Sequence, residues 1–176
     1  MDRVFFEQLA MPLFDQLYNH ACWLTGGDRT DAEDLVQETY AKALKGFGSF
    51  AEGTNLRAWM FRILRNIFLT SKSGLAARNT QYLEDDELRT DLAMAHDLTP
   101  ELLLLRSQSE HAVFTALESL PVNYRQIILL SEVEEMSYRE IAEVLDVPPG
   151  TVMSRLSRAR ASLRAALNAN AGQEVR

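Results

Sequence analysis

The sequence contains very little cysteine: Cys22 is the single thiol among 176 residues. One cysteine forms no disulfide within the chain, which argues against a disulfide-stabilised secreted domain. Long apolar runs are also missing, since no stretch approaches the roughly 20 apolar residues that cross a bilayer. The N-terminal segment mixes acids among its apolar residues and has no basic region before them, unlike a signal peptide. We therefore expect a cytoplasmic protein without membrane insertion.

Side chains that carry catalysis or bind metals are sparse as well. The three histidines stand far apart, and none has a partner at the spacing of a metal site or a nucleophile–base pair. Gly26 and Gly27 lack the lysine and serine that complete a phosphate-binding loop. The adjacent acids Glu134 and Glu135 are expected to be solvated. We predict no enzymatic activity, no cofactor and no metal.

Alternation of polar and apolar residues is not sustained anywhere, so no β-sheet is expected. Helical periodicity is present instead, and the predicted helices cover residues 4–24, 31–47, 55–72, 101–119, 121–134 and 137–164, the last as two helices. Thr30–Glu33 and Ser137–Glu140 both have the form of a capping box at a helix start.

The segment between the two groups of helices is acidic and has no sustained period. From Gln81 to Glu101 seven acids stand against Arg89 alone. A structureless segment of this length is unusual inside one compact domain. We predict an all-α chain of two small helical domains, residues 1–75 and 101–170, joined by a flexible acidic linker at 76–100.

Residues 137–164 have the pattern of a helix-turn-helix. Pro148, Pro149 and Gly150 are expected to form the turn, and Thr151 to cap the second helix. Apolar residues recur on that helix at helical spacing, at Val152, Leu156, Ala159, Leu163 and Ala166. Its other faces carry four arginines and no acid, in a chain of net charge −7. A helix lying in the major groove of DNA explains this charge; arginines that merely solvate a bundle helix are the alternative.

The N-terminal end of such a helix points at base edges, and the residues expected to read bases are Thr151, Met153, Ser154 and Arg155. Arginines further along the helix are expected to hold phosphates, namely Arg158, Arg160 and Arg164. A second basic segment runs from Gly53 to Asn79, where five basic residues occur without an acid. Two basic segments separated by an acidic tether predict two contacts with DNA.

The two helices before the linker each have a polar and an apolar side. The helix at 31–47 is expected to bury Ala32, Leu35, Val36, Thr39, Ala43, Leu44 and Phe47, and to expose Asp31, Asp34, Gln37, Glu38 and Lys42. The helix at 55–72 is expected to bury Leu56, Trp59, Met60, Ile63, Leu64 and Ile67. Three arginines, Arg57, Arg62 and Arg65, fall away from that stripe.

Together these motifs resemble, in order and spacing, the sigma-70 family of bacterial RNA polymerase sigma factors, in its extracytoplasmic-function (ECF) group. Residues 31–44 are similar to the polymerase-binding helix of the domain called sigma-2. Residues 50–68 are similar to its −10 promoter segment, and residues 120–164 to sigma-4, which reads the −35 element. The chain is too short for the sigma-1.1 and sigma-3 regions of larger sigma factors.

The resemblance implies a function and a set of contacts. Sigma-2 would bind the β′ clamp helices of core RNA polymerase through Asp31, Asp34, Gln37 and Glu38, and sigma-4 would bind the β flap. The loop 50–55 would capture a flipped base of the −10 strand, with DNA contacts from Thr54, Asn55, Arg57, Arg62 and Arg65. The −35 element would be contacted by Thr151, Met153, Ser154, Arg155, Arg158 and Arg160.

Two residues depart from patterns of the family. The phase of Trp59 places it in the core, whereas housekeeping sigma factors expose aromatic residues for strand melting. Met153 stands where many relatives have arginine, and it offers only an apolar contact to a thymine methyl group.

The resemblance also implies regulation. Members of this group are usually held inactive by an anti-sigma factor, and residues 53–64 are similar to a subgroup paired with zinc-binding, thiol-responsive anti-sigma factors. We expect the unbound chain to bind duplex DNA poorly. A free-standing helix-turn-helix regulator that binds DNA as a dimer is the competing hypothesis, although it does not need an N-terminal half of this form. An enzyme with a DNA-binding tail lacks a catalytic site.

Overall fold

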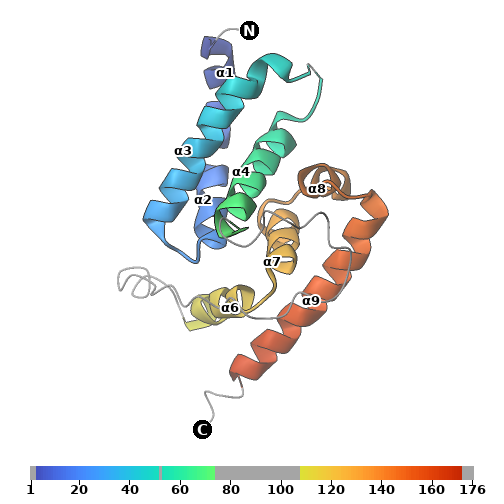
Figure 1. Cartoon of the computed structure of the whole chain (residues 1–176). Coiled ribbons are helices and arrows are strands. Elements are labelled where there is room, and N and C mark those ends of the chain that lie inside the picture. Colours follow the sequence, from blue (N-terminus) through green and yellow to red (C-terminus); the bar gives the residue numbers. More distant parts are fainter. Residues whose placement is uncertain (1–2, 52, 74–107, 172–176) are drawn as a thin grey trace.

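The computed structural model describes residues 3–51, 53–73 and 108–171, and all its regular elements within these ranges are helical (Figure 1). The predicted all-α class is confirmed for this part of the chain. The predicted linker at 76–100, and the start of the helix predicted from residue 101, lie outside the described residues. We call α1–α4 the N-terminal domain and α6–α9 the C-terminal domain.

The N-terminal domain is built on three helices that pack on one another, α2, α3 and α4. Its elements are α1 (Arg3–Ala10), η1 (Met11–Leu13), α2 (Phe14–Leu24), α3 (Arg29–Gly46), η2 (Phe47–Ser49) and α4 (Leu56–Ser73). The prediction of one helix over residues 4–24 is wrong at its centre. Pro12 has no backbone N–H to donate, and the chain forms a 3₁₀ turn there that separates α1 from α2.

The start of α3 also differs from the prediction. Asp28, not Thr30, is the N-cap, and its Oδ1 accepts a hydrogen bond from the backbone N of Asp31 at 3.0 Å. Gly26 and Gly27, with φ of 71° and 88°, turn the chain immediately before this cap, a conformation that favours glycine. Aspartate is a preferred N-cap residue, so the sequence did carry this signal.

The C-terminal domain contains the helix-turn-helix, formed by α8 and α9. Its described elements are α6 (Gln108–Glu118), α7 (Val122–Ile128), the π-helical η3 (Leu129–Val133), α8 (Tyr138–Leu145) and α9 (Pro149–Ala171). The capping box at Ser137 and Glu140 is confirmed. The predicted turn is wrong by two residues: α9 begins at Pro149, so Thr151 lies within its first turn and does not cap it. Proline is well tolerated there because the first helical N–H has no partner within the helix.

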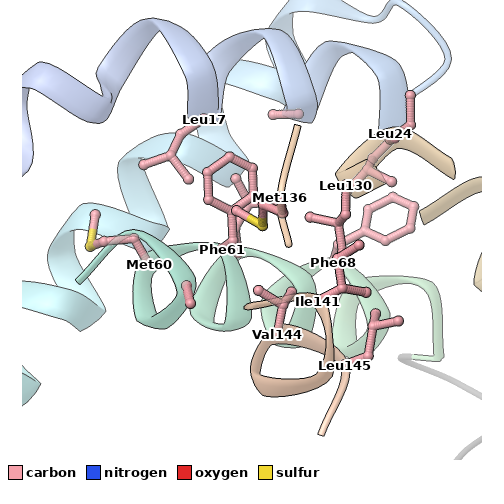
Figure 2. Close-up of a cluster of buried hydrophobic side chains, with 14 of the residues drawn as sticks. Leu17, Leu24, Met60, Phe61, Phe68, Leu130, Met136, Ile141, Val144 and Leu145 are labelled. Carbon is pink, nitrogen blue, oxygen red and sulfur yellow. The ribbon is translucent and has the colours of Figure 1, made fainter. Parts of the chain in front are cut away.

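The buried side chains of both domains form one continuous cluster, and α4 lies in its middle. Figure 2 shows Leu17 and Leu24 of α2 on one side of Phe61 and Phe68, and residues of the C-terminal domain such as Ile141 on the other. The predicted burial of Met60, Leu64 and Ile67 is confirmed, with Leu56, Trp59 and Ile63 half-buried. Phe61 and Phe68 are buried as well, because α4 has neighbours on more than one side.

The faces of α3 and α9 largely follow their periodicity. The predicted inner residues of α3 are buried except Leu44, which is 39% exposed. On α9, Val152, Leu156 and Ala159 are buried and Leu163 is half-buried. The amphipathic patterns therefore placed both helices correctly.

Candidate polymerase and nucleic-acid interface

The predicted polymerase contacts form an exposed stripe on α3. Asp31, Asp34, Gln37 and Glu38 are all exposed, and Glu38 pairs with Lys42 at 2.8 Å one turn along the helix. A hollow of about 260 Å³ beside this stripe is bordered by Asp34 and Glu38 from α3 and by Lys72 from α4. Acidic and amide side chains in this arrangement suit a partner helix that carries arginines.

Local hydrogen bonds hold the described residues of the loop before α4. The Thr54 hydroxyl donates to the backbone oxygen of Ala51 at 2.7 Å, and Asn55 Oδ1 accepts from the backbone N of Ala58 at 3.1 Å. Asn55 therefore caps α4 through its oxygen, a role that the sequence analysis did not assign to it. Its other amide atom, Nδ2, donates to Glu140 Oε1 at 2.7 Å, across the boundary between the two domains.

Two of the predicted −10 arginines also contact the C-terminal domain. Arg57 donates from Nη2 to the backbone oxygen of Glu134, and the same nitrogen lies 3.4 Å from Glu134 Oε2. Arg65 donates from Nε to Gln126 Oε1 at 3.2 Å. Both arginines are half-buried, whereas Arg62 is exposed. Arg57 and Arg65 do point away from the apolar stripe of α4, as expected, but there they meet the second domain and not solvent.

The expectation that Glu134 is solvated is wrong. Glu134 is 6% exposed and lies between Arg57 of α4 and His20 of α2. The Nδ1 atom of His20 is 3.4 Å from Glu134 Oε1. The chain turns sharply here, since the π-helical segment η3 is followed by Glu135 at a φ of 51°. Periodicity alone does not reveal this turn, so the contribution of Glu134 could not be predicted.

A cavity of about 770 Å³ lies between the 49–55 loop and the helix-turn-helix. Phe50 and Trp59 border it, with ring centroids 5.1 Å apart. Trp59 was expected to be in the core; it is half-buried, and it packs near Gly46, where an added Cβ would sit 3.5 Å from its ring. Trp59 thus has both a packing role and a surface on the cavity, which is also bordered by Asn55 and Arg62.

The predicted −35 residues lie on α9 outside its buried stripe. Met153, Ser154 and Arg158 are exposed, with Met153 at 61%, while Thr151 and Arg155 are half-buried. Ser154 donates its hydroxyl hydrogen to the backbone oxygen of Thr151 at 3.1 Å. This face can enter a groove with its first two turns, as a recognition helix requires.

Arg160 differs from the other predicted phosphate contacts. Its Nε lies 3.0 Å from Glu132 Oε1, so it joins α9 to η3. The hydrogen bond from Arg160 holds the pKa of Glu132 below its usual range. Arg160 therefore forms an ion pair within the domain. Its partner Glu132 lies 28 residues earlier, so the helical spacing of α9 could not predict the pair.

Neither a metal centre nor a membrane segment emerges from the described residues. Within them, histidine, cysteine and acidic side chains nowhere gather in the threes that could hold a metal ion. The helices of this same part of the chain are too short or too polar to span a bilayer.

Comparison with known proteins agrees with both domains. Residues 9–76 match the family model for sigma-70 region 2, and residues 110–163 match that for sigma-70, region 4. The ECF RNA polymerase sigma-E factor of Haemophilus influenzae is 37% identical over 140 residues, which cover 75% of this chain and 72% of that protein. The ECF RNA polymerase sigma factor SigE of Mycolicibacterium smegmatis is 34% identical over 165 residues, 90% of this chain, but the chain spans only 63% of that protein's length.

Two solved structures are similar over nearly the whole chain. The sigma factor RpoE of Bartonella quintana, in complex with the anti-sigma factor NepR, has a TM-score of 0.67 and 30% identity, covering 93% of this chain and 96% of that one. CnrH, in complex with the cytosolic domain of CnrY, has a TM-score of 0.66 and 26% identity, with coverage of 96% and 90%. Regions 2 and 4 in this order are the parts of a promoter-directed initiation factor, and the chain belongs to the sigma-70 family, in its ECF group of RNA polymerase sigma factors.

Proposed function

We propose that this chain binds core RNA polymerase, directs it to promoters through their −10 and −35 elements, and promotes transcription initiation. The observation that carries the proposal is the pairing of two matched regions with two suitable surfaces: an exposed acidic stripe on α3 and an exposed arginine-bearing face on α9. Opening of the −10 strand uses binding energy, so no nucleotide is hydrolysed and the chain is not an enzyme.

Core polymerase is contacted at two places. The α3 stripe of Asp31, Asp34, Gln37 and Glu38 binds the β′ clamp helices, and the C-terminal domain binds the β flap. Exposed carboxylates on a rigid helix provide charge-assisted hydrogen bonds to a basic partner helix. Because transcription takes place there, the chain acts in the cytoplasm.

The promoter is read at two places as well. Thr54 and Asn55 contact a flipped −10 base, while Arg57, Arg62 and Arg65 hold the strand's phosphates. Met153, Ser154 and Arg155, with Thr151 beside them, read the −35 bases, and Arg158 holds a phosphate. Arg160 serves phosphate binding only after it leaves Glu132, so we assign it mainly to the structure of the domain.

An anti-sigma factor holds the chain inactive until a stress signal arrives. The support is that the similar sigma factor RpoE of Bartonella quintana is bound to the anti-sigma factor NepR in its structure. We propose a zinc-binding, thiol-responsive partner, in which the sensing chemistry takes place. Cys22 is the only thiol of this chain and cannot sense oxidants by forming an internal disulfide.

Run-off transcription with core polymerase on a promoter library tests the proposed function. Wild-type chain is expected to select a subset of promoters, and Asp34→Lys to reduce total initiation at least tenfold by repelling a basic partner helix. Glu33→Lys is the matched control, because Glu33 is exposed on α3 but lies outside the stripe. Absence of initiation by the wild-type chain, together with no retention on immobilised core polymerase, would favour a free-standing regulator instead.

A further inference from the structure

The basic face of α9 has a carboxylate beside it that comes from another element. From Gly150 to Ala166 the sequence has four arginines and no acid, yet the structure brings Glu132 of η3 to Arg160. We propose that Glu132 is an internal counter-ion, which holds Arg160 and thereby limits the affinity of the −35 surface for the phosphates of duplex DNA. The proposal rests on the proposed function, because it concerns the strength of binding at the same −35 surface.

Arg160 lies on the side of α9 that is assigned to DNA. It follows Met153 by seven residues, or nearly two helical turns, so both side chains leave the helix in nearly the same direction. Met153 is 61% exposed and the side chain of Arg160 is 44% exposed, whereas Val152 and Leu156 are buried. An arginine two turns beyond the base-reading residues is in a position to meet phosphates at the edge of the groove.

Glu132 occupies the donors of Arg160 that a phosphate would use. The Nε atom of Arg160 donates to Glu132 Oε1 at 3.0 Å, and Nη2 donates to the same oxygen. The Ser131 hydroxyl also donates to Oε1, at 3.2 Å, and helps to keep the carboxylate in place. A carboxylate and a phosphate offer arginine the same kind of negatively charged oxygen. Because Nε and Nη2 are already engaged, Arg160 cannot make the same hydrogen bonds to DNA without leaving Glu132.

The charge of Glu132 subtracts from the charge that α9 presents to DNA. The hydrogen bond from Arg160 keeps the pKa of Glu132 below its usual range, so the carboxylate is ionised at neutral pH. Sequence-independent binding depends on how many cations replace the counterions of phosphates, and an arginine paired with a carboxylate no longer counts among them. The base-reading residues are unaffected, because Arg160 lies beyond them on α9. Glu132 therefore lowers the affinity for duplex DNA of any sequence.

Low affinity for DNA of any sequence matters for the unbound chain. Phosphate contacts supply essentially all non-specific binding, so an additional unpaired arginine would hold more of the chain on duplex DNA, away from polymerase. On polymerase, the α3 stripe provides a second anchor and raises the effective concentration of the −35 surface at its element. Promoter binding by the assembled enzyme therefore tolerates a counter-ion that weakens DNA binding by the chain alone.

The test measures binding of the full-length chain, without polymerase, to a labelled 20-base-pair duplex of random sequence by fluorescence anisotropy. Glu132→Gln removes the charge and keeps the size of the side chain. Exposed ion pairs contribute little to folding, so the helices should persist. Glu135→Gln is the matched control, since it makes the same change of net charge at an exposed residue of the same domain. Far-UV circular dichroism checks the fold of both variants.

We expect Glu132→Gln to bind the duplex about tenfold more tightly than wild type at 50 mM salt and about twofold more tightly at 0.5 M salt. The plot of log affinity against log salt concentration should steepen by about 0.9, the value of one additional phosphate contact. The control should keep the wild-type slope, because salt screens charges that do not contact the DNA. A purely structural role of Glu132 would change stability but would not steepen this plot.

A second comparison tests whether Glu132 acts through Arg160. In a chain that already carries Arg160→Gln, the addition of Glu132→Gln should tighten DNA binding by less than threefold, because no arginine remains to be released. Equal tightening with and without Arg160 would show simple repulsion between Glu132 and DNA, and it would overturn the counter-ion proposal.

The outcomes distinguish this proposal from the −35 assignment itself. If Arg158→Ala weakens duplex binding but Glu132→Gln leaves both affinity and salt dependence unchanged, α9 binds DNA and the counter-ion proposal alone fails. If neither wild type nor Glu132→Gln binds the duplex at 50 mM salt, α9 is not a DNA-binding surface, and the −35 assignment fails together with the counter-ion.

Discussion

The two surfaces assigned to promoter DNA differ in this structure in where the partners of their side chains lie, since on α9 Arg160 pairs with Glu132 of its own domain. On α4, Asn55 and Arg57 are engaged by carboxylates of the other domain. On α9, Met153 and Ser154 are exposed. Both surfaces carry arginines on helices, so composition does not explain the difference. The difference lies in the neighbouring elements. Helix α8 packs on α4, and η3 brings Glu134 to Arg57.

The comparison leads us to expect that the two surfaces differ in how readily they bind DNA in the unbound chain. We expect the −35 surface alone to bind DNA weakly, because the combination of both surfaces on polymerase raises the effective concentration of each for its element. Covering the −10 surface in the unbound chain therefore lowers DNA binding without weakening the −35 reader.

The largest expected effect concerns the core beneath the covered surface. Phe61 is 1% exposed and packs at the junction of the domains, so Phe61→Ala should lower the free energy of unfolding by about 3–5 kcal/mol. Phe5→Ala is the control, since Phe5 is 43% exposed and its loss should cost about 1 kcal/mol or less. Urea denaturation followed by circular dichroism measures both. Similar values for the two variants would show that the junction is not a packed core.

The second effect concerns the exposed surface. Arg155→Ala should remove about 1–3 kcal/mol of discrimination at one −35 base pair, or about 5–150-fold in promoter preference. Arg158→Ala, by contrast, should weaken all promoters alike and reduce the salt dependence by about one charge. Run-off transcription on promoters with single −35 changes distinguishes the two. Neither variant should alter energy transfer between the two domains in the unbound chain. The dyes are attached to cysteines introduced by Gln8→Cys and Ala161→Cys in a chain carrying Cys22→Ala; positions 8 and 161 are exposed, on α1 and α9. A change in that transfer would show that the α9 surface also affects the contact between the domains.

The third effect concerns Asn55 on the α4 surface. Asn55→Asp keeps an oxygen that can cap α4 but replaces the amide donor by a carboxylate that faces Glu140. We expect opening of the domains together with about a tenfold loss of −10 selectivity, roughly the value of one hydrogen bond. Asn19→Asp adds the same charge at an exposed position of α2 and serves as the control. Loss of selectivity without domain opening would show that Asn55 does not help to hold the domains together.

The smallest effect lies outside both surfaces. The Tyr40 hydroxyl donates to the backbone oxygen of Ala10 at 2.7 Å, and burial raises the pKa of Tyr40 to about 12. Tyr40→Phe should therefore cost about 1 kcal/mol at neutral pH. Because the folded pKa lies above the unfolded one, near 10, wild type loses this advantage as pH rises from 10 towards 12. The difference in thermal midpoint between the two chains should narrow over that range, and a widening gap would contradict the assignment.

The sequence was sufficient for the features that depend on local pattern. The helical class, the order of the domains, the buried stripe at Val152 and Leu156, and the capping box at Ser137 all follow from spacing and residue type. The start of α3 was predicted two residues late, because Thr30 and Asp28 are both suitable cap residues. Pro12 also indicated a helix break, but the apolar residues on both sides of it favoured a single long helix.

The contacts between domains were not predictable from one sequence. Periodicity identified one apolar stripe on α4, but it does not tell which of the remaining faces meets a second domain far along the chain. Arg57 therefore looked solvent-directed, and Glu134 looked like one of two solvated acids. In the structure the two are within 3.4 Å of each other, because η3 and the left-handed Glu135 reverse the chain at that point.

The most direct measurement of the central claim is energy transfer between the same two dye positions, on α1 and α9, as core polymerase is added to the wild-type chain. The packing of the two domains in this structure predicts high transfer in the unbound chain and a saturable decrease at one equivalent of polymerase, with run-off activity appearing over the same titration. Low transfer before polymerase is added, or high transfer that persists in an active holoenzyme, would contradict the claim that the −10 surface is covered until the enzyme binds.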